Sequence, residues 1–138
     1  MAPEAQDPIA FLNRLLEAER AGVKVLATLL PELQKDSVIS LAKNFLHDEG
    51  MNCQILKTLI ENLGGTASSN TGDFVQKVAA LQSIEEKLAL LIRGQEWVAS
   101  YIRKNRRLLS KTSERLFLEA MKIQHEENVD ILTKLLSN

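Results

Sequence analysis

Apolar residues recur every three or four positions along four long stretches of the chain, and this spacing is typical of amphipathic α-helices. The repeats run through residues 9–30, 41–59, 84–102 and 118–135. No stretch alternates apolar and polar residues as a strand with one buried face would. The pattern therefore predicts an all-α fold built from four long helices.

Local signals place the beginnings of these helices. Asp7, followed by proline, has the form of an N-cap and a first helical residue. Asp36 or Ser37 is expected to cap the second helix. Ser83, with Glu86 three residues later, forms the capping-box pattern that opens the third helix.

The connections between the helices indicate their directions. Short breaks after the first and third helices predict two antiparallel hairpins, whereas about 20 residues join the second helix to the third. That connection contains the low-complexity stretch GGTASSNTG and an apolar segment, 74–81, where Asp73 and Gln76 predict one or two helical turns. We therefore expect one domain over residues 1–138, with two hairpins joined by a long crossover that carries a short helix. Residues 1–7 are expected to be flexible.

The composition narrows the class of protein. The chain has 138 residues, a net charge of −1 and a single cysteine, Cys53. One cysteine allows neither an internal disulfide nor a cysteine-based zinc site. The balanced charge gives no reason to expect nucleic acid as a partner. No run of about 18 apolar residues is present, so no association with a membrane is expected. With no secretory signal pattern either, the default location is a reducing cytoplasm.

Polar residues interrupt the apolar face of each long helix near its middle. Antiparallel packing would bring these interruptions to similar heights, and a buried carboxylate is costly unless it is paired, hydrogen-bonded or metal-bound. We therefore expect one polar layer across the core. Its members on a helical wheel are Glu19 in the first helix, Asp48 and Asn52 in the second with Glu49 at the edge of the arc, Gln95 in the third, and His125 and Asn128 in the last.

Three stretches that contain these residues, LNRLLEAERAG, DEGMNCQILKTLIENLGG and HEENVDIL, resemble helices of bacterioferritin and its relatives. The chain thus resembles the ferritin-like superfamily, which includes rubrerythrin-type four-helix bundles, and the resemblance covers all four helices in order. It implies a ferritin-like topology and places Glu19 and Glu49 at positions of ligand glutamates. Asn52 stands at the position of a ligand histidine.

The same resemblance implies a degenerate di-iron motif. The family holds two irons with a Glu from each of two helices and Glu-x-x-His from each of the other two. Here Gln95 and His125 stand at carboxylate positions, and Asn128 stands at a histidine position. Two carboxylates, or three if Asp48 turns inward, would then face four positive charges, and amides are poor iron ligands beside imidazole and carboxylate. A di-iron centre is therefore not expected.

Two interpretations of the polar layer remain open. In the first, it is a metal-free network in which amides and imidazole donate hydrogen bonds to the carboxylates. In the second, Glu19, Glu49 and His125 bind one divalent metal ion, which would be zinc, manganese or iron. The cofactor is accordingly none or one such ion. The second-rank candidate ligands are Asp48, Asn52, Gln95 and Asn128.

These interpretations lead to different functions. A metal-free network suits a non-catalytic ferritin-like domain used for association or as a scaffold. An ion suits a metal-binding protein or a metal-dependent oxidoreductase. A third candidate is a small-molecule binder that uses the polar layer for recognition. No nucleophilic triad, phosphate loop or nucleotide fingerprint is readable in the sequence.

Two further features concern packing. Trp97, with Leu90 and Tyr101, gives the third helix a second apolar face, which could hold the crossover or form the interface of a symmetric homodimer. Gly22, Gly50 and Gly94 lie mid-helix near the polar layer. Each should cost about 1 kcal/mol relative to alanine. Close helix packing, or room for a small ligand or water, would compensate for that cost.

Overall fold

The computed structural model describes residues 7–137, and within this range the chain is helical and contains no strand. The all-α prediction is confirmed. The predicted flexibility of residues 1–7 concerns residues outside the described range, except for Asp7. The helical segments are α1 (Pro8–Leu29), the short 3₁₀ helix η1 (Leu30–Glu32), α2 (Asp36–Asn62), α3 (Phe74–Ala79), α4 (Ile84–Asn105), the short 3₁₀ helix η2 (Arg106–Leu108) and α5 (Thr112–Leu136).

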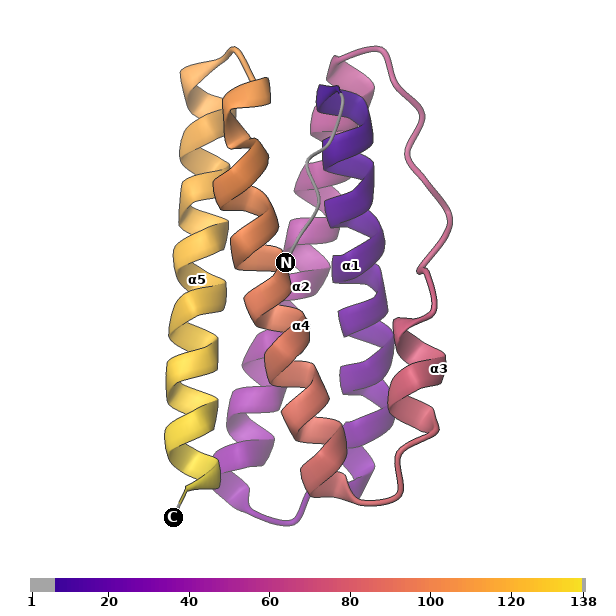
Figure 1. Cartoon of the computed structure of the whole chain (residues 1–138), viewed down its shortest axis with the longest axis vertical. Coiled ribbons are helices and arrows are strands. Elements are labelled where there is room, and N and C mark those ends of the chain that lie inside the picture. Colours follow the sequence, from indigo (N-terminus) through magenta and orange to yellow (C-terminus); the bar gives the residue numbers. More distant parts are fainter. Residues whose placement is uncertain (1–6, 138) are drawn as a thin grey trace.

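The long helices α1, α2, α4 and α5 lie side by side (Figure 1). Helices α1 and α2 form one antiparallel hairpin, and α4 and α5 form the other. Helices α2 and α4 point in the same direction, because the connection between them returns along the whole length of α1 before α4 begins. Helix α3 lies on this return path and packs against α1 and α4.

Side chains of α1 hold the connection, residues 63–73, against that helix through hydrogen bonds. Asparagine, glutamate and arginine side chains of α1 bond with backbone and hydroxyl groups of the connection. These bonds join Asn13 to the Thr66 carbonyl (3.0 Å) and the Ser68 amide (2.7 Å), Glu17 to the Ser68 hydroxyl (2.6 Å), and Arg20 to the Asn70 carbonyl (2.9 Å).

The helix ends follow the local signals in part. Asp7 Oδ1 accepts a hydrogen bond from the Ala10 amide at 2.8 Å. Ser83 and Glu86 form both bonds of the capping box. The expected cap of α2 is wrong, because Asp36 is already the first helical residue and Lys35 precedes it without a side-chain cap. A carboxylate in the first turn still favours the helix through its dipole.

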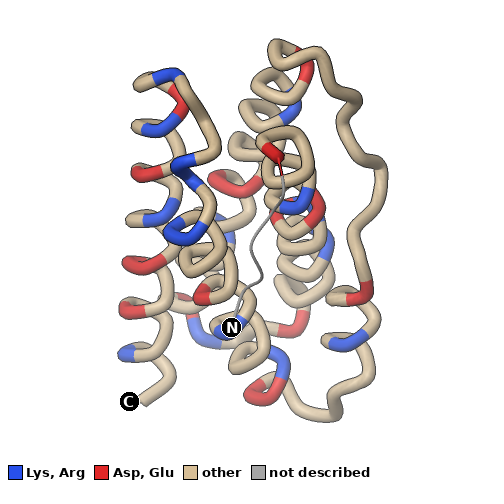
Figure 2. Tube along the Cα trace, turned by 45° about the horizontal axis from the view of Figure 1, so that its top comes forward, with Lys and Arg blue, Asp and Glu red and all other residues tan. Residues whose placement is uncertain are grey.

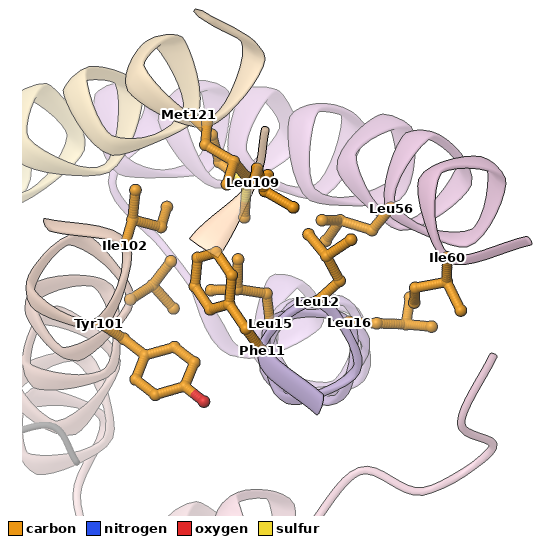
Figure 3. Packing of buried hydrophobic residues seen from close by; sticks show 12 residues of the cluster. Phe11, Leu12, Leu15, Leu16, Leu56, Ile60, Tyr101, Ile102, Leu109 and Met121 are labelled. Carbon is orange, nitrogen blue, oxygen red and sulfur yellow. The ribbon is translucent and has the colours of Figure 1, made fainter. Parts of the chain in front are cut away.

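The apolar core is divided by the polar layer. One cluster joins the beginning of α1 to the end of α4 and contains Phe11, Leu12, Tyr101 and Ile102 (Figure 3). A second cluster joins the end of α1 to the beginning of α4 around Leu26. The polar residues of each helix lie between its contributions to the two clusters. They are therefore shielded from solvent at both ends of the bundle.

The buried face of α2 differs from the expected one. The sequence placed Asp48 inside the apolar arc and Glu49 at its edge, but Glu49 is buried and Asp48 is only half-buried. Apolar residues flank this face on both sides, so the centre of the arc was ambiguous on a wheel. The buried residues are Val38, Ala42, Phe45, Glu49, Asn52, Leu56 and Ile60.

Basic and acidic residues are interspersed along the long helices (Figure 2). Basic residues near the α4–α5 turn have acidic partners on α5: Arg103 pairs with Glu126 at 2.9 Å, and Arg106 pairs with Glu119. The expectation that the protein has no nucleic-acid partner stays a prediction. In the described part of the chain, every helix is too short or too polar to cross a lipid bilayer.

Candidate metal centre

The four long helices bring six of the seven predicted polar-layer residues together inside the bundle. Asp48 is the exception, since its side chain is only half-buried and acts on the layer through its charge. The buried six are Glu19 from α1, Glu49 and Asn52 from α2, Gln95 from α4, and His125 and Asn128 from α5.

Glu19 is the most fully bonded carboxylate of the layer. Its Oε1 accepts a hydrogen bond from Asn52 Nδ2 at 2.8 Å, and its Oε2 lies 3.0 Å from His125 Nε2. Asn52 Nδ2 also donates to Gln124 Oε1 at 3.0 Å. Gln124 is a member of the network that sequence reasoning missed, because it lies at the edge of the apolar face of α5.

His125 is held in one orientation by its own helix. Its Nδ1 lies 2.9 Å from the Met121 carbonyl oxygen. A carbonyl oxygen can only accept, so Nδ1 carries a hydrogen and Nε2 is the nitrogen turned toward Glu19. This arrangement is the one that presents Nε2 to a metal ion when the proton on Nε2 is removed. Without an ion, a proton on Nε2 completes the bond to Glu19.

Glu49 is the least satisfied group of the layer. Its side chain is 2% exposed, and its Oε2 is buried without a hydrogen-bond partner. Its carboxylate occupies space that Gly22 leaves open on α1, since a Cβ on Gly22 would lie 2.0 Å from Glu49 Oε1. The mid-helix glycine therefore makes room for this carboxylate. Gly22 was noticed in the sequence, but its partner could not be read there.

The proton affinities of Glu49 and His125 are both raised. Burial raises the pKa of Glu49 well above its ordinary value, and the charge of Glu19 raises it further, against the lowering effects of His125 and of the hydrogen bond from Gln95. Burial alone would lower the pKa of His125. The charge and hydrogen bond of Glu19, assisted by Glu49 and the Met121 carbonyl, outweigh burial and raise this pKa to about 9.

Gln95 and Asn128 complete the layer on the other hairpin. Asn128 Nδ2 donates to Gln95 Oε1 at 3.3 Å. Because this bond uses only the Gln95 oxygen, the Gln95 amide nitrogen is available to donate to Glu49. These two residues thus act as hydrogen-bonding partners of the layer rather than as its charged members.

Glu19, Glu49 and His125 are arranged as a metal centre would require. Each offers one ligand atom, and these atoms all lie within 4.8 Å of one another. Among the described residues, no other group of His, Cys, Asp and Glu side chains meets this condition. Carboxylate oxygen and imidazole nitrogen suit zinc, manganese and iron(II). Three protein ligands leave at least one coordination position open.

The Trp97 face of α4 lies next to the crossover. The Trp97 and Tyr101 rings stack with centroids 4.7 Å apart, and Tyr101 is buried. Arg14 lies over the Trp97 ring, 5.3 Å from its centroid. Phe74 of α3 packs against Gly94, where a Cβ would come within 2.9 Å of its ring. The crossover thus covers part of this face, while a homodimer through Trp97 and Tyr101 stays a prediction.

Comparison with known proteins gives a family without an assigned function. No curated protein and no solved structure matches the chain. Residues 6–134 match the family described as "Domain of unknown function (DUF6306)". The polar layer and the helices that carry it all lie inside the matched region. The chain therefore belongs to the DUF6306 family.

Proposed function

We propose that this protein binds a single divalent metal ion through Glu19, Glu49 and His125. The observation that carries the proposal is the convergence of these three buried side chains, with ligand atoms within 4.8 Å of one another. The unpartnered Oε2 of Glu49 adds to it, because a buried carboxylate oxygen without a donor is costly. A cation would satisfy it.

The surrounding residues fit the same role. The Met121 carbonyl fixes the His125 tautomer, and Asn52 donates to the Glu19 carboxylate, so both ligands are oriented by partners behind them. An ion here would supply an electrophilic centre with an open position for water or a small molecule. Its charge of +2 would be balanced by the two carboxylates, with neutral imidazole as the third ligand.

We also propose kinship with the ferritin-like superfamily as the origin of this layer. The shared direction of α2 and α4 and the long crossover support it, together with the resemblance of the segments around Glu19 and Glu49. A di-iron centre does not fit the donor set. Asp48 stays outside the cluster, and amides stand at the remaining ligand positions.

The proposal is tested by counting bound metal. Purified protein would be stripped with a chelator, dialysed against zinc, manganese or iron(II), and analysed by elemental mass spectrometry. We expect one ion per chain for the wild type and little for Glu49→Gln, which keeps the shape of the side chain. Glu61→Gln is the matched control, because it makes the same change at an exposed position of α2.

Thermal melting provides an independent readout. A ligand that binds only the folded state at a free concentration of about 100 Kd adds about 2.7 kcal/mol of stability. For a chain of this size that raises Tm by roughly 10 °C. Chelation should reverse the increase in the wild type and in Glu61→Gln. A wild type that retains no ion and does not change its Tm would refute metal binding.

One observation favours a second candidate, a purely structural network. Both oxygens of Glu19 already have partners, Asn52 and His125, without any ion. A satisfied polar layer of this kind can fix helix register. The same metal analysis separates the two, since a structural network predicts no bound ion and no response to chelator. In either case, the cytoplasmic location remains a prediction.

A further inference from the structure

A pocket leads from the surface to the polar layer. It has a volume of about 290 Å³ and lies between α1, α4 and the crossover with α3. Glu19, Glu49 and Gln95 form its inner end. His125 and Asn52 do not line it, so the pocket approaches the layer from the α1–α4 side only. The unpartnered Oε2 belongs to Glu49, a residue of this inner end.

The middle of the pocket is apolar. Phe74 from α3 and Trp97 from α4 contribute aromatic rings, and the remaining walls are small or aliphatic, including Ala18 and Leu91. Such walls take a flat or aliphatic body and exclude water from it. Gly94 lets Phe74 approach α4 closely and so sets the width of the pocket at this height.

The outer end of the pocket is cationic on balance. Arg14, Lys77 and Arg93 line it together with the acidic Glu17 and Asp73, which leaves one positive charge in excess (three minus two). Lys77 and Asp73 lie 3.4 Å apart, and Arg14 lies 3.7 Å from Glu17. Arg93 is the lining cation for which the structure shows no such acidic partner, among the residues it describes. An anionic group is therefore best placed near Arg93.

We propose that this pocket binds a small monocarboxylate whose apolar body ends in a hydroxyl group. The carboxylate lies at the outer end near Arg93, the body lies between Phe74 and Trp97, and the hydroxyl reaches Glu49. The three polarities of the pocket, cationic, apolar and carboxylate, follow this order from outside to inside. The hydroxyl donates to the carboxylate of Glu49 in the metal-free protein. These contacts are those of the metal-free protein, so the inference does not depend on the metal.

The probe is 4-hydroxybenzoate, which has these three parts in line. Trp97 is the only tryptophan of the chain and lines the pocket, so its fluorescence reports binding directly. Titrations would use both metal-free and zinc-treated protein. We expect saturable binding of 4-hydroxybenzoate. Benzoate, which lacks the inner donor, and phenol, which lacks the carboxylate, should each bind about tenfold more weakly.

Variants assign the binding to this pocket. Ala18→Leu fills the wall and should weaken 4-hydroxybenzoate binding by about tenfold or more, whereas Ala27→Leu adds the same bulk to an exposed position of α1 and should not. Arg93→Gln should weaken the two acids but not phenol, with the exposed Lys57→Gln as its control. If Ala18→Leu proves unstable, the comparison of Arg93→Gln with Lys57→Gln still tests whether the acids bind in this pocket.

The outcomes separate cleanly. The proposal is overturned if benzoate binds as well as 4-hydroxybenzoate, if Arg93→Gln and Lys57→Gln bind alike, or if no saturable signal is seen. Binding to the metal-free protein together with failure to retain zinc would uphold the pocket and refute the metal centre. Retention of zinc without any response to the three probes would uphold the metal centre and refute the proposed ligand of the pocket.

Discussion

At the scale of single residues, Glu19 and Glu49 carry the same carboxyl group but differ in how fully it is hydrogen-bonded. Both carboxylates are buried, but Glu19 has a partner on each oxygen and Glu49 has an oxygen with none. A charge inside a protein stabilises only when its partners outweigh the cost of removing it from water. The same substitution should therefore have different effects at the two positions.

In the metal-free protein, Glu19→Gln should lower the free energy of unfolding by about 2 kcal/mol, because it removes the partner of the His125 imidazolium. Glu49→Gln should be neutral or stabilising, because it removes a group that burial disfavours in its charged form. Urea unfolding at pH 7 in the presence of chelator measures both. Equal losses for the two variants would show that their partners do not differ in the way described.

The titration of His125 makes the metal-free protein less stable in alkali. Its pKa of about 9 lies above the unfolded value of 6.5, so its contribution is fully present below pH 6.5 and is lost as pH rises to 9. The loss is at most about 3 kcal/mol. The raised pKa of Glu49 acts in the same direction, from its unfolded value of 4.5 upward.

Melting curves between pH 6 and pH 9.5 in chelator would show this trend as a falling Tm. His125→Gln should flatten the part of the slope above pH 6.5, whereas His47→Gln, at an exposed position, should keep the wild-type slope. A wild-type Tm that is level across this range would contradict the assignment of a buried imidazolium paired with Glu19.

At the scale of helices, much of the fold could be predicted because each signal is local. Periodicity predicted the long helices, and the caps at Asp7 and Ser83 were correct. The rotation of α2 was missed, because apolar residues border both sides of its buried face and the wheel therefore placed Asp48 inside the arc and Glu49 at its edge. The contact between Gly22 and Glu49 could not be predicted either, since it depends on the distance between two helices.

Two mid-helix glycines form a matched pair for an experiment. Gly22→Ala should lower the free energy of unfolding by about 2 kcal/mol, because its Cβ would collide with the Glu49 carboxylate. Gly50→Ala should raise it by about 0.5–1 kcal/mol, because its Cβ meets nothing within 4 Å and alanine favours the helix. Adding Glu49→Ala to Gly22→Ala should recover part of the loss, which a double-mutant cycle would measure.

At the scale of the whole molecule, the proposed centre joins the two hairpins. Glu19 and Glu49 belong to the α1–α2 hairpin, and His125 belongs to the α4–α5 hairpin. The apolar clusters on either side of the layer already hold the hairpins together. An ion at the centre would add a direct link between them, so metal binding should suppress openings that separate one hairpin from the other.

Hydrogen exchange followed by mass spectrometry would detect this link. Zinc should slow exchange of the amides near Glu19, Glu49 and His125, while α3, which contributes none of the three ligands, serves as an internal control. Uniform slowing over all helices, α3 included, would indicate general stabilisation. No slowing at all near the three residues would count against a link through the centre.

The hydrogen bonds between α1 and residues 66–70 attach this part of the crossover to the first hairpin, α1–α2. Because Asn13, Glu17 and Arg20 hold residues 66–70, a break in the chain at the exposed Gly72 would leave the segment in place on the first hairpin. That fragment would already display the surface on which α4 docks. The two halves, produced as separate polypeptides, should therefore reassociate into the complete four-helix fold. The Kd of this complex would measure how well the surfaces of the two hairpins complement each other.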